Sequence, residues 1–287
     1  MSTCYFPLQK YLQKNIKENQ TTQFMILVDD HCHLTHELYK NDLDQVLERA
    51  RKAGVVAIIC SGVNVPTNRE ALEIAKKYTP LVRASLGIYP VDALGIPADE
   101  SGLSRQEGPI DLDSEFDFIK KNKHDIAAIG EVGLDSHWVK DPELQKKQRE
   151  NFARVIQFAE DIKKPLVVHT RDAESDAVEM LASSSVKNVV LHCFTGRKSV
   201  VKRAIDLGYY FSIPAIIEKL QHFKMIAEMA SINQLLSETD GPWLSPISGR
   251  NEPANVLYTV RNIAKVKGFT EEEVANNIWL NFQRVFG

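Results

Sequence analysis

The sequence has few cysteines and no CxxC pair. Its four cysteines, Cys4, Cys32, Cys60 and Cys193, are too sparse for a disulfide-stapled secreted domain, so we expect a reducing compartment, the cytoplasm. Long apolar runs are also missing. The run from Val55 to Cys60 has the length of a strand, far below the ~20 residues that a membrane-spanning helix needs. We therefore expect a soluble protein with no membrane partner.

Neither sign of charge dominates the composition. The chain has 35 Lys and Arg against 38 Asp and Glu, a formal net charge of −3. No bulk positive field marks it as a nucleic-acid binder. This sum still permits a polyanionic substrate, because metal ions or a few local cations can supply the attraction. The Gly-rich phosphate loops of nucleotide-binding sheets, GxGxxG and the Walker motif, are absent.

Short apolar runs alternate with longer segments of helical period from Met25 onward, which is typical of βα units. Eight runs over the 263 residues from Met25 to Gly287 give about 33 residues per unit, the length of a β-loop-α module. The sequence therefore predicts an α/β fold, a single-domain (β/α)8 TIM-like barrel over residues 25–287. The alternative is an open doubly wound sheet. The predicted strands cover residues 26–33, 55–62, 81–88, 126–134, 165–170, 188–194, 209–213 and 233–240.

The segments outside these strands are predicted to form helices, one insertion and an N-terminal extension. Residues 91–109 carry no period and are expected to form an insertion that lines the mouth of the barrel. Residues 1–24 are expected to be a flexible N-terminal extension, with Met25 as an alternative start. The predicted helices cover residues 42–53, 68–78, 143–162, 175–181, 199–207, 218–229, 254–266 and 271–285.

Side chains that can bind metal stand where apolar runs stop. His31 and His33 are two residues apart, so in a strand both imidazoles project to one side while Cys32 points the other way as a buried thiol. Further histidines and acids follow later runs. The carboxyl ends of barrel strands meet at one mouth, so we expect these side chains to converge. The later members of this set are Glu131, His169, His192 and Asp240.

Four imidazoles and two carboxylates are more ligands than one four-coordinate ion with an open position needs. We therefore predict two divalent metal ions per chain, with Glu131 as the bridge between them. A nitrogen-rich donor set suits Zn, Mn, Fe or Ni better than Mg. The identity of the metal stays open among Zn, Mn and Mg.

Several motifs resemble the TatD-type metal-dependent deoxyribonucleases, a family within the amidohydrolase-like barrels. The motifs are DDHCHL at 29–34, GEVGLD at 130–135, KPLVVHTRDA at 164–173, LHCFTG at 191–196, ETDGPWLSP at 238–246 and GRNEP at 249–253. The resemblance spans residues 25–287. It implies a TIM-like barrel and phosphodiester hydrolysis, namely exonuclease trimming of DNA ends with divalent metal.

The resemblance also implies roles for single residues. It implies that Asp240 is the general base and that Asp240 and Glu131 are the catalytic residues. One departure is Tyr89, where the family commonly has a histidine before the proline. A phenol can donate a hydrogen bond to phosphate but adds no positive charge at neutral pH. The implied ligand sets are His31, His33, Glu131 and Asp240 for the first metal and Glu131, His169 and His192 for the second.

Four residues are predicted to bind substrate: Arg171, Tyr89, Trp138 and Trp243. Arg171 can clamp a phosphate oxygen, and the alternative is a surface ion pair with Asp172 or Glu174. The two tryptophans can stack on unpaired bases, and the alternative is simple loop packing.

We expect the substrate to be DNA with single-stranded or frayed ends, because a narrow barrel mouth does not easily admit a duplex. An alternative is a metal-dependent amidohydrolase or esterase that acts on a small molecule. Such relatives often have a lysine at the bridging position, where this chain has Glu131. A further alternative is a metal-dependent binding protein without catalysis.

Overall fold

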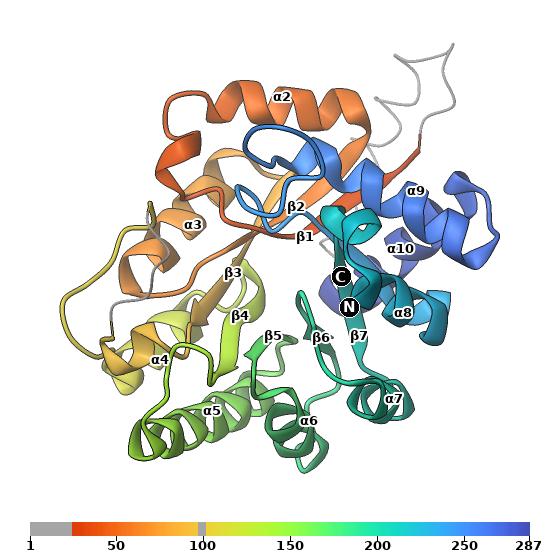
Figure 1. Ribbon diagram of the computed structural model, residues 1–287. Helices are drawn as coiled ribbons and strands as arrows, with labels where there is room; N and C mark the ends of the chain where they lie inside the picture. The colour runs from red at the N-terminus through yellow and green to blue at the C-terminus, as the bar shows by residue number, and fades with distance from the viewer. Residues whose placement is uncertain (1–24, 97–101) are drawn as a thin grey trace.

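Eight parallel strands form one sheet in the order of the sequence, and helices surround them (Figure 1). This computed structural model describes residues 25–96 and 102–287, so the predicted extension at residues 1–24 lies outside the described residues. The predicted (β/α)8 barrel is confirmed. The strands are β1 (Leu27–Cys32), β2 (Val55–Ser61), β3 (Val82–Ile88), β4 (Ile126–Asp135), β5 (Leu166–Arg171), β6 (Val189–Leu191), β7 (Tyr210–Pro214) and β8 (Leu235–Glu238).

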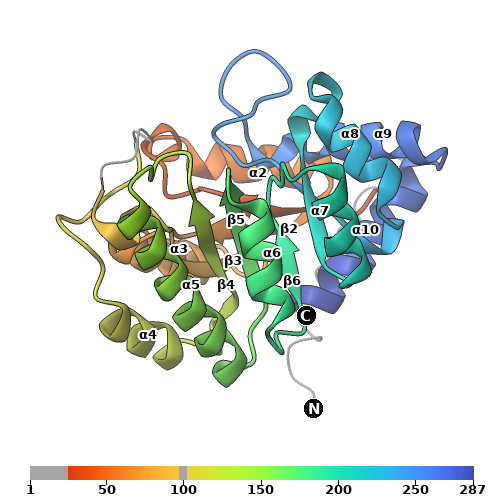
Figure 2. The same ribbon diagram turned by 60° about the horizontal axis from the view of Figure 1, so that its bottom comes forward.

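Each of the predicted helical segments contains a helix, and Figure 2 shows α5, α6 and α7 outside the strands. In the described part of the chain, no helix is both long and apolar enough to span a membrane. The helices are α2 (Leu43–Ala53), α3 (Val65–Lys77), α4 (Leu112–Lys121), α5 (Pro142–Ile162), α6 (Glu174–Ala182), α7 (Lys198–Asp206), α8 (Gln221–Met229), α9 (Val256–Lys267) and α10 (Glu271–Phe286).

Helix α4 was not predicted, although its local signals are ordinary. Asp111 caps its first turn, because a side-chain oxygen accepts from the backbone N–H of Asp113 at 3.1 Å. The helix follows the segment predicted as an insertion. That segment contains the short 3-10 helix η2 (Asp92–Leu94), and its residues 97–101 lie outside the described residues.

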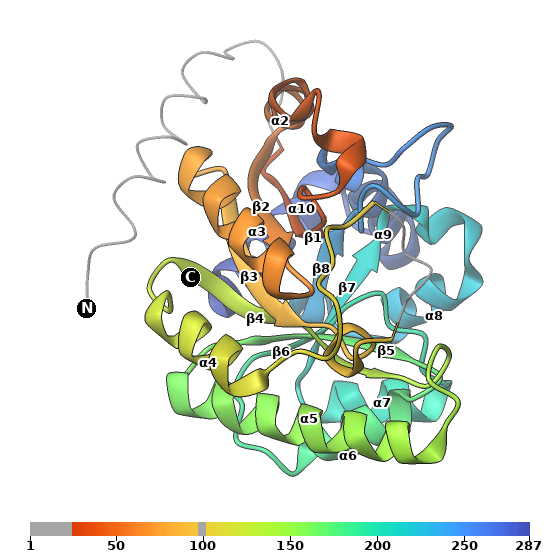
Figure 3. The same ribbon diagram turned by 90° about the vertical axis from the view of Figure 1, so that its left-hand side faces the viewer.

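The barrel closes at a seam between β1 and β8. The backbone N–H of Asp240 donates to the carbonyl of His31 at 3.0 Å, and the N–H of His33 donates to the carbonyl of Gly241 at 2.8 Å. Deeper in the seam, the buried Asp29 carboxylate accepts from the backbone N–H and the hydroxyl of Thr239, at 2.9 and 2.6 Å. Helices α9 and α10 cover β1 and β8 from outside (Figure 3). The seam therefore fixes the end of β8 beside the end of β1.

Strand β4 is buried over its whole length and shifts register against both neighbours. At this shift the backbone of Glu131 lies against Gly87 in β3. A Cβ atom at Gly87 would lie 2.1 Å from the nitrogen and 2.3 Å from the oxygen of Glu131. Asn68 of α3 holds Gly87 in place, since its side-chain amide bonds both the N–H and the carbonyl of Gly87, at 2.9 and 2.8 Å. Glycine at this position is what allows the close approach.

We expect Gly87→Ala to lower the free energy of unfolding by about 3 kcal/mol, because the added methyl group meets backbone atoms that cannot rotate away. Denaturant unfolding followed by circular dichroism measures this loss. Gly208→Ala is the control: no atom lies within 4 Å of its Cβ position, and its φ of +79° costs about 1 kcal/mol for a non-glycine residue. A Gly87→Ala loss no larger than that of the control would contradict the close-approach argument.

Candidate metal centre

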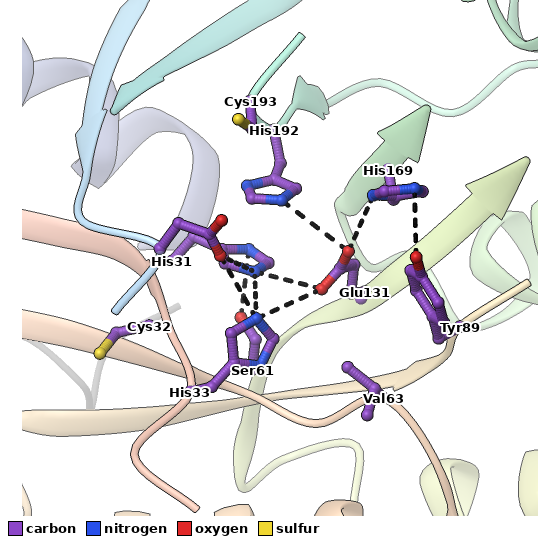
Figure 4. Close-up of polar contacts among 12 residues, drawn as sticks. His31, Cys32, His33, Ser61, Val63, Tyr89, Glu131, His169, His192 and Cys193 are labelled. Atoms are coloured by element: carbon purple, nitrogen blue, oxygen red, sulfur yellow. Dashed lines mark hydrogen bonds and ion pairs between the residues drawn. The ribbon is translucent and has the colours of Figure 1, made fainter. Parts of the chain in front are cut away.

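His31 and His33 point to the same side of β1, as the two-residue period of a strand predicts (Figure 4). Their Nε2 atoms lie 3.1 Å apart. The thiol of Cys32 points away from them and lies 3.6 Å from the carbonyl oxygen of Gly241. Both imidazoles are buried at the mouth of the barrel.

Glu131 stands between two pairs of histidines. Its Oε2 atom lies 3.3 Å from Nε2 of His31 and 3.5 Å from Nε2 of His33. Its Oε1 atom lies 3.1 Å from Nδ1 of His169 and 3.8 Å from Nε2 of His192. The carboxylate thus offers one oxygen to each pair, which is the arrangement that a ligand shared by two ions requires.

Asp240 joins this cluster across the seam. Its Oδ1 atom lies 3.5 Å from Nε2 of His33 and 3.9 Å from Nε2 of His31. Its backbone has a φ of +54°, in the left-handed region that few residues other than glycine adopt. The hydrogen bond from the Asp240 N–H to His31 holds the residue there. The side chain is 15% exposed against 6% for Glu131, so Asp240 is the more accessible of the two acids.

The donor atoms fall into three overlapping groups, and within each group they lie within 4.8 Å of one another. Imidazole nitrogen and carboxylate oxygen are the donors that Zn, Mn and Fe accept in proteins. The residues therefore fit a divalent metal. The groups are His31 with His33 and Glu131, His31 with His192 and Asp240, and Glu131 with His169 and His192.

The histidines of the cluster differ in their readiness to carry a proton. Burial and the stacked ring of His192, with centroids 3.7 Å apart, lower the pKa of His31 to about 4. Burial also lowers the pKa of His169 and His192, but neighbouring carboxylates outweigh it. Asp135 and Glu131 raise the pKa of His169 to about 9, and Glu238 raises that of His192 to about 10.

The two acids of the cluster are ionised at neutral pH. Burial raises the pKa of Glu131, but its hydrogen bonds with His169 and His31 outweigh this and hold the pKa well below the ordinary value. Burial likewise raises the pKa of Asp240, and the hydrogen bond with His33 reverses the effect. Each acid thus keeps lone pairs that can bind a metal or accept a proton.

Three residues behind the cluster escaped the sequence analysis. Ser61 contacts His31, Asp135 contacts His169, and Glu238 contacts His192. All three are buried. Asp135 and Glu238 stand within motifs that the resemblance used, but no periodicity distinguished them. The usable signal is the presence of a charged residue at the end of a fully buried strand, which needs a partner inside the barrel.

The four predicted substrate contacts lie in three places. Arg171 is exposed at the end of β5, and its guanidinium carbon lies 5.7 Å from the centre of the Trp138 ring. Trp243 lies over the cluster, with its ring 5.1 Å from that of His33. Tyr89 is different: it is 1% exposed, and its hydroxyl donates to Asp135 at 3.1 Å.

Both tryptophans are partly buried and pack against a small apolar cluster that includes Val63 and Leu103, so loop packing accounts for part of each ring. Arg171 has no ion pair among the described residues. The neighbouring Asp172 instead lies 3.3 Å from His137 and 3.7 Å from Lys140.

Comparison with known proteins places the chain among metal-dependent nucleases and hydrolases. The family model "TatD related DNase" matches residues 28–287. The human deoxyribonuclease TATDN3 is 35% identical over 264 residues, which covers 91% of this chain and 94% of the relative. An uncharacterized metal-dependent hydrolase of Methanocaldococcus jannaschii, MJ1582, is 34% identical over 90% of this chain and 96% of its own length.

Solved structures agree on the fold. The crystal structure of YJJV, a TatD homolog from Escherichia coli, superposes with a TM-score of 0.77 at 21% identity, over 92% of this chain and 99% of its own. A TatD family hydrolase from Entamoeba histolytica gives a TM-score of 0.77 at 20% identity, over 92% of this chain and 99% of its own. At these identities the likeness concerns the barrel alone.

The raised pKa values of His169 and His192 predict that metal binding releases protons. Both rings are protonated in the metal-free protein at pH 7.5, so an ion must displace about two protons, and its apparent affinity should rise with pH until about 9–10. Calorimetric titration with Zn²⁺ in buffers of different ionisation enthalpy counts these protons. His192→Ala should release about one proton fewer. A heat of binding that does not depend on the buffer would contradict the prediction.

Proposed function

The chain belongs to the TatD related DNase family, and we propose that it is a divalent-metal-dependent phosphodiester hydrolase that trims DNA from its ends. The observation that carries this proposal is the Glu131 carboxylate, which faces His31 and His33 with one oxygen and His169 and His192 with the other. This arrangement supports two divalent ions, Zn, Mn or Mg, with Glu131 as the shared ligand.

The histidines and acids of the cluster would hold the ions, which when bound would supply Lewis-acid chemistry: a lower pKa for a water molecule and stabilisation of charge on the phosphate. Asp240 accepts the proton of that water as the general base. Its carboxylate is suited to the role because it is ionised and more exposed than Glu131. A base must also be held within hydrogen-bond reach of its proton, and the seam contact with His31 supplies that restraint.

The loops around the mouth support a nucleic-acid substrate. The exposed Arg171 guanidinium is available to bind a phosphate oxygen. Trp138 lies beside it and Trp243 lies over His33, so aromatic surface flanks the cluster on which unpaired bases can stack. We therefore propose single-stranded or frayed DNA ends as the substrate.

We also propose that the protein works in a reducing compartment, the cytoplasm. Cys32, Cys60 and Cys193 are free thiols, which supports this location.

Replacing the proposed general base tests the reaction directly. We expect Asp240→Asn to lower kcat on end-labelled single-stranded DNA by at least about 100-fold, because the amide cannot accept the proton of the water. The assay uses metal-stripped protein with Mg, Mn or Zn added back separately. Asp206→Asn, an exposed acid of α7 paired with Lys202, is the matched control and should cleave normally.

Metal-dependent laddering from one end identifies an exonuclease and the ion that supports it. Glu131→Ala should lose metal and activity together, because both pairs of histidines lose their common oxygen ligand. If the wild-type protein binds metal but does not cleave DNA with Mg, Mn or Zn added, the nuclease proposal fails and the small-molecule hydrolase takes its place.

Arg171→Ala tests the proposed phosphate contact separately from the metal. We expect KM for DNA to rise about 10-fold, the effect of losing one hydrogen bond from a charged donor, while the bound metal is retained. Elemental analysis of the purified variant measures the metal. Arg203→Ala, which removes an arginine of α7 paired with Glu179, is the control and should leave KM unchanged. Loss of metal in the Arg171 variant would refute the assigned role.

A further inference from the structure

Three histidines of the cluster, His31, His169 and His192, each face Glu131 with one ring nitrogen. A buried residue contacts the other nitrogen of each ring. Behind His31 this residue is Ser61, whose hydroxyl lies 3.2 Å from Nδ1. Behind His169 it is Asp135, with Oδ2 at 3.0 Å from Nε2. The contacts therefore differ in charge: a neutral hydroxyl supports the His31 side of the cluster, and a carboxylate supports the His169 side.

Hydrogen bonds hold the Asp135 side chain in place, and both of its carboxylate oxygens act as acceptors. Its Oδ1 atom accepts from the backbone N–H groups of His137 and Trp138, at 2.9 and 2.8 Å. Its Oδ2 atom accepts from the Tyr89 hydroxyl at 3.1 Å and faces His169. Because that oxygen accepts, Nε2 of His169 must donate. When the ring loses its second proton, as metal binding requires, the lone pair is left on Nδ1, the atom that lies 3.1 Å from Glu131.

Glu238 does the same for His192 from the end of β8. Its Oε1 atom accepts from the backbone N–H of Cys193 at 3.1 Å, and its Oε2 atom lies 2.8 Å from Nδ1 of His192. The side chain is fully buried, so water does not compete for this contact. When His192 gives up its second proton to a metal, its lone pair is therefore left on Nε2, which points at Glu131 (Figure 4).

We propose that Asp135 and Glu238 are positioning residues for the metal position shared by His169 and His192, and that they set its affinity independently of the position beside His31 and His33. This proposal rests on the proposed two-metal function. A carboxylate behind an imidazole fixes the tautomer and strengthens the ring as a donor, whereas the Ser61 hydroxyl adds no charge on the other side.

Tyr89 belongs to the same positioning group. Its hydroxyl is 3.1 Å from Asp135 and 3.5 Å from Nε2 of His169, and the residue is 1% exposed. The phenol thus acts on the acid behind the histidine, which differs from the phosphate contact expected from the sequence. The two roles separate in kinetics: a phosphate contact governs KM for DNA, and a positioning role governs metal affinity.

The test is a titration of metal-free protein with Mn²⁺, with the free ion followed by electron paramagnetic resonance. The wild-type protein should bind in two steps. Asp135→Asn and Glu238→Gln should each weaken one and the same step by about 10–100-fold and leave the other unchanged. Ser61→Ala is the matched control for the opposite side, and it should affect only the step that the other two variants spare.

Tyr89→Phe removes a single oxygen atom, so it keeps the test possible if the Asp135 or Glu238 variants fail to fold. It should weaken the Asp135-dependent step by less than Asp135→Asn does, with KM for DNA unchanged. Equal weakening of both steps by Asp135→Asn, or a Tyr89→Phe variant altered only in KM, would overturn this proposal alone. A wild-type protein that binds no Mn²⁺ would overturn it together with the proposed function, whereas two-step binding without DNA cleavage would overturn only the nuclease.

Discussion

Closure of the barrel between β1 and β8 is the constraint on which the rest of the structure depends. The two strands lie far apart in the sequence, yet the candidate metal cluster combines His31 and His33 from one with Asp240, which follows the other. Two backbone hydrogen bonds at the strand ends join them, and a buried clasp between Asp29 and Thr239 lies deeper in the seam. Burial raises the pKa of Asp29 well above its ordinary value, so the clasp also places a costly polar group in the core. Its hydrogen bonds to Thr239 offset that cost, and they work only when the barrel is closed.

The barrel architecture could be predicted from the sequence, and so could the convergence of the strand-end histidines and acids at its mouth. Strand period put His31 and His33 on one side, and barrel topology implied that residues ending distant strands would meet. The residues that could not be predicted lie behind the proposed ligands. Asp135 and Glu238 act from behind their histidines, and no spacing along the chain records which side of a ring an acid will contact. Gly87 was equally invisible, because its role follows from a register shift between β3 and β4 that only three-dimensional packing determines.

Glu131 shows that a strand can extend beyond the apolar run that predicts it. The run stops at Gly130, but β4 continues to Asp135, so the Glu131 carboxylate projects from the interior of a buried strand. Because β4 pairs with β3 on one side and β5 on the other, Glu131 is restrained more firmly than a loop residue would be. The same strand then ends at Asp135, the acid that contacts His169. One strand therefore carries both a proposed ligand, Glu131, and the acid proposed to position another, Asp135.

The division of labour between strands and loops has a consequence for how this protein can change over evolutionary time. The metal cluster is built on strands or on the residues directly after them, whereas Trp138, Trp243 and the segment around Leu103 belong to connections that follow the strands. Connections tolerate insertion and replacement far better than buried strands do. Lineages can therefore remodel the rim to admit new substrates while inheriting the same hydrolytic chemistry, so divergence in specificity should outpace divergence in mechanism.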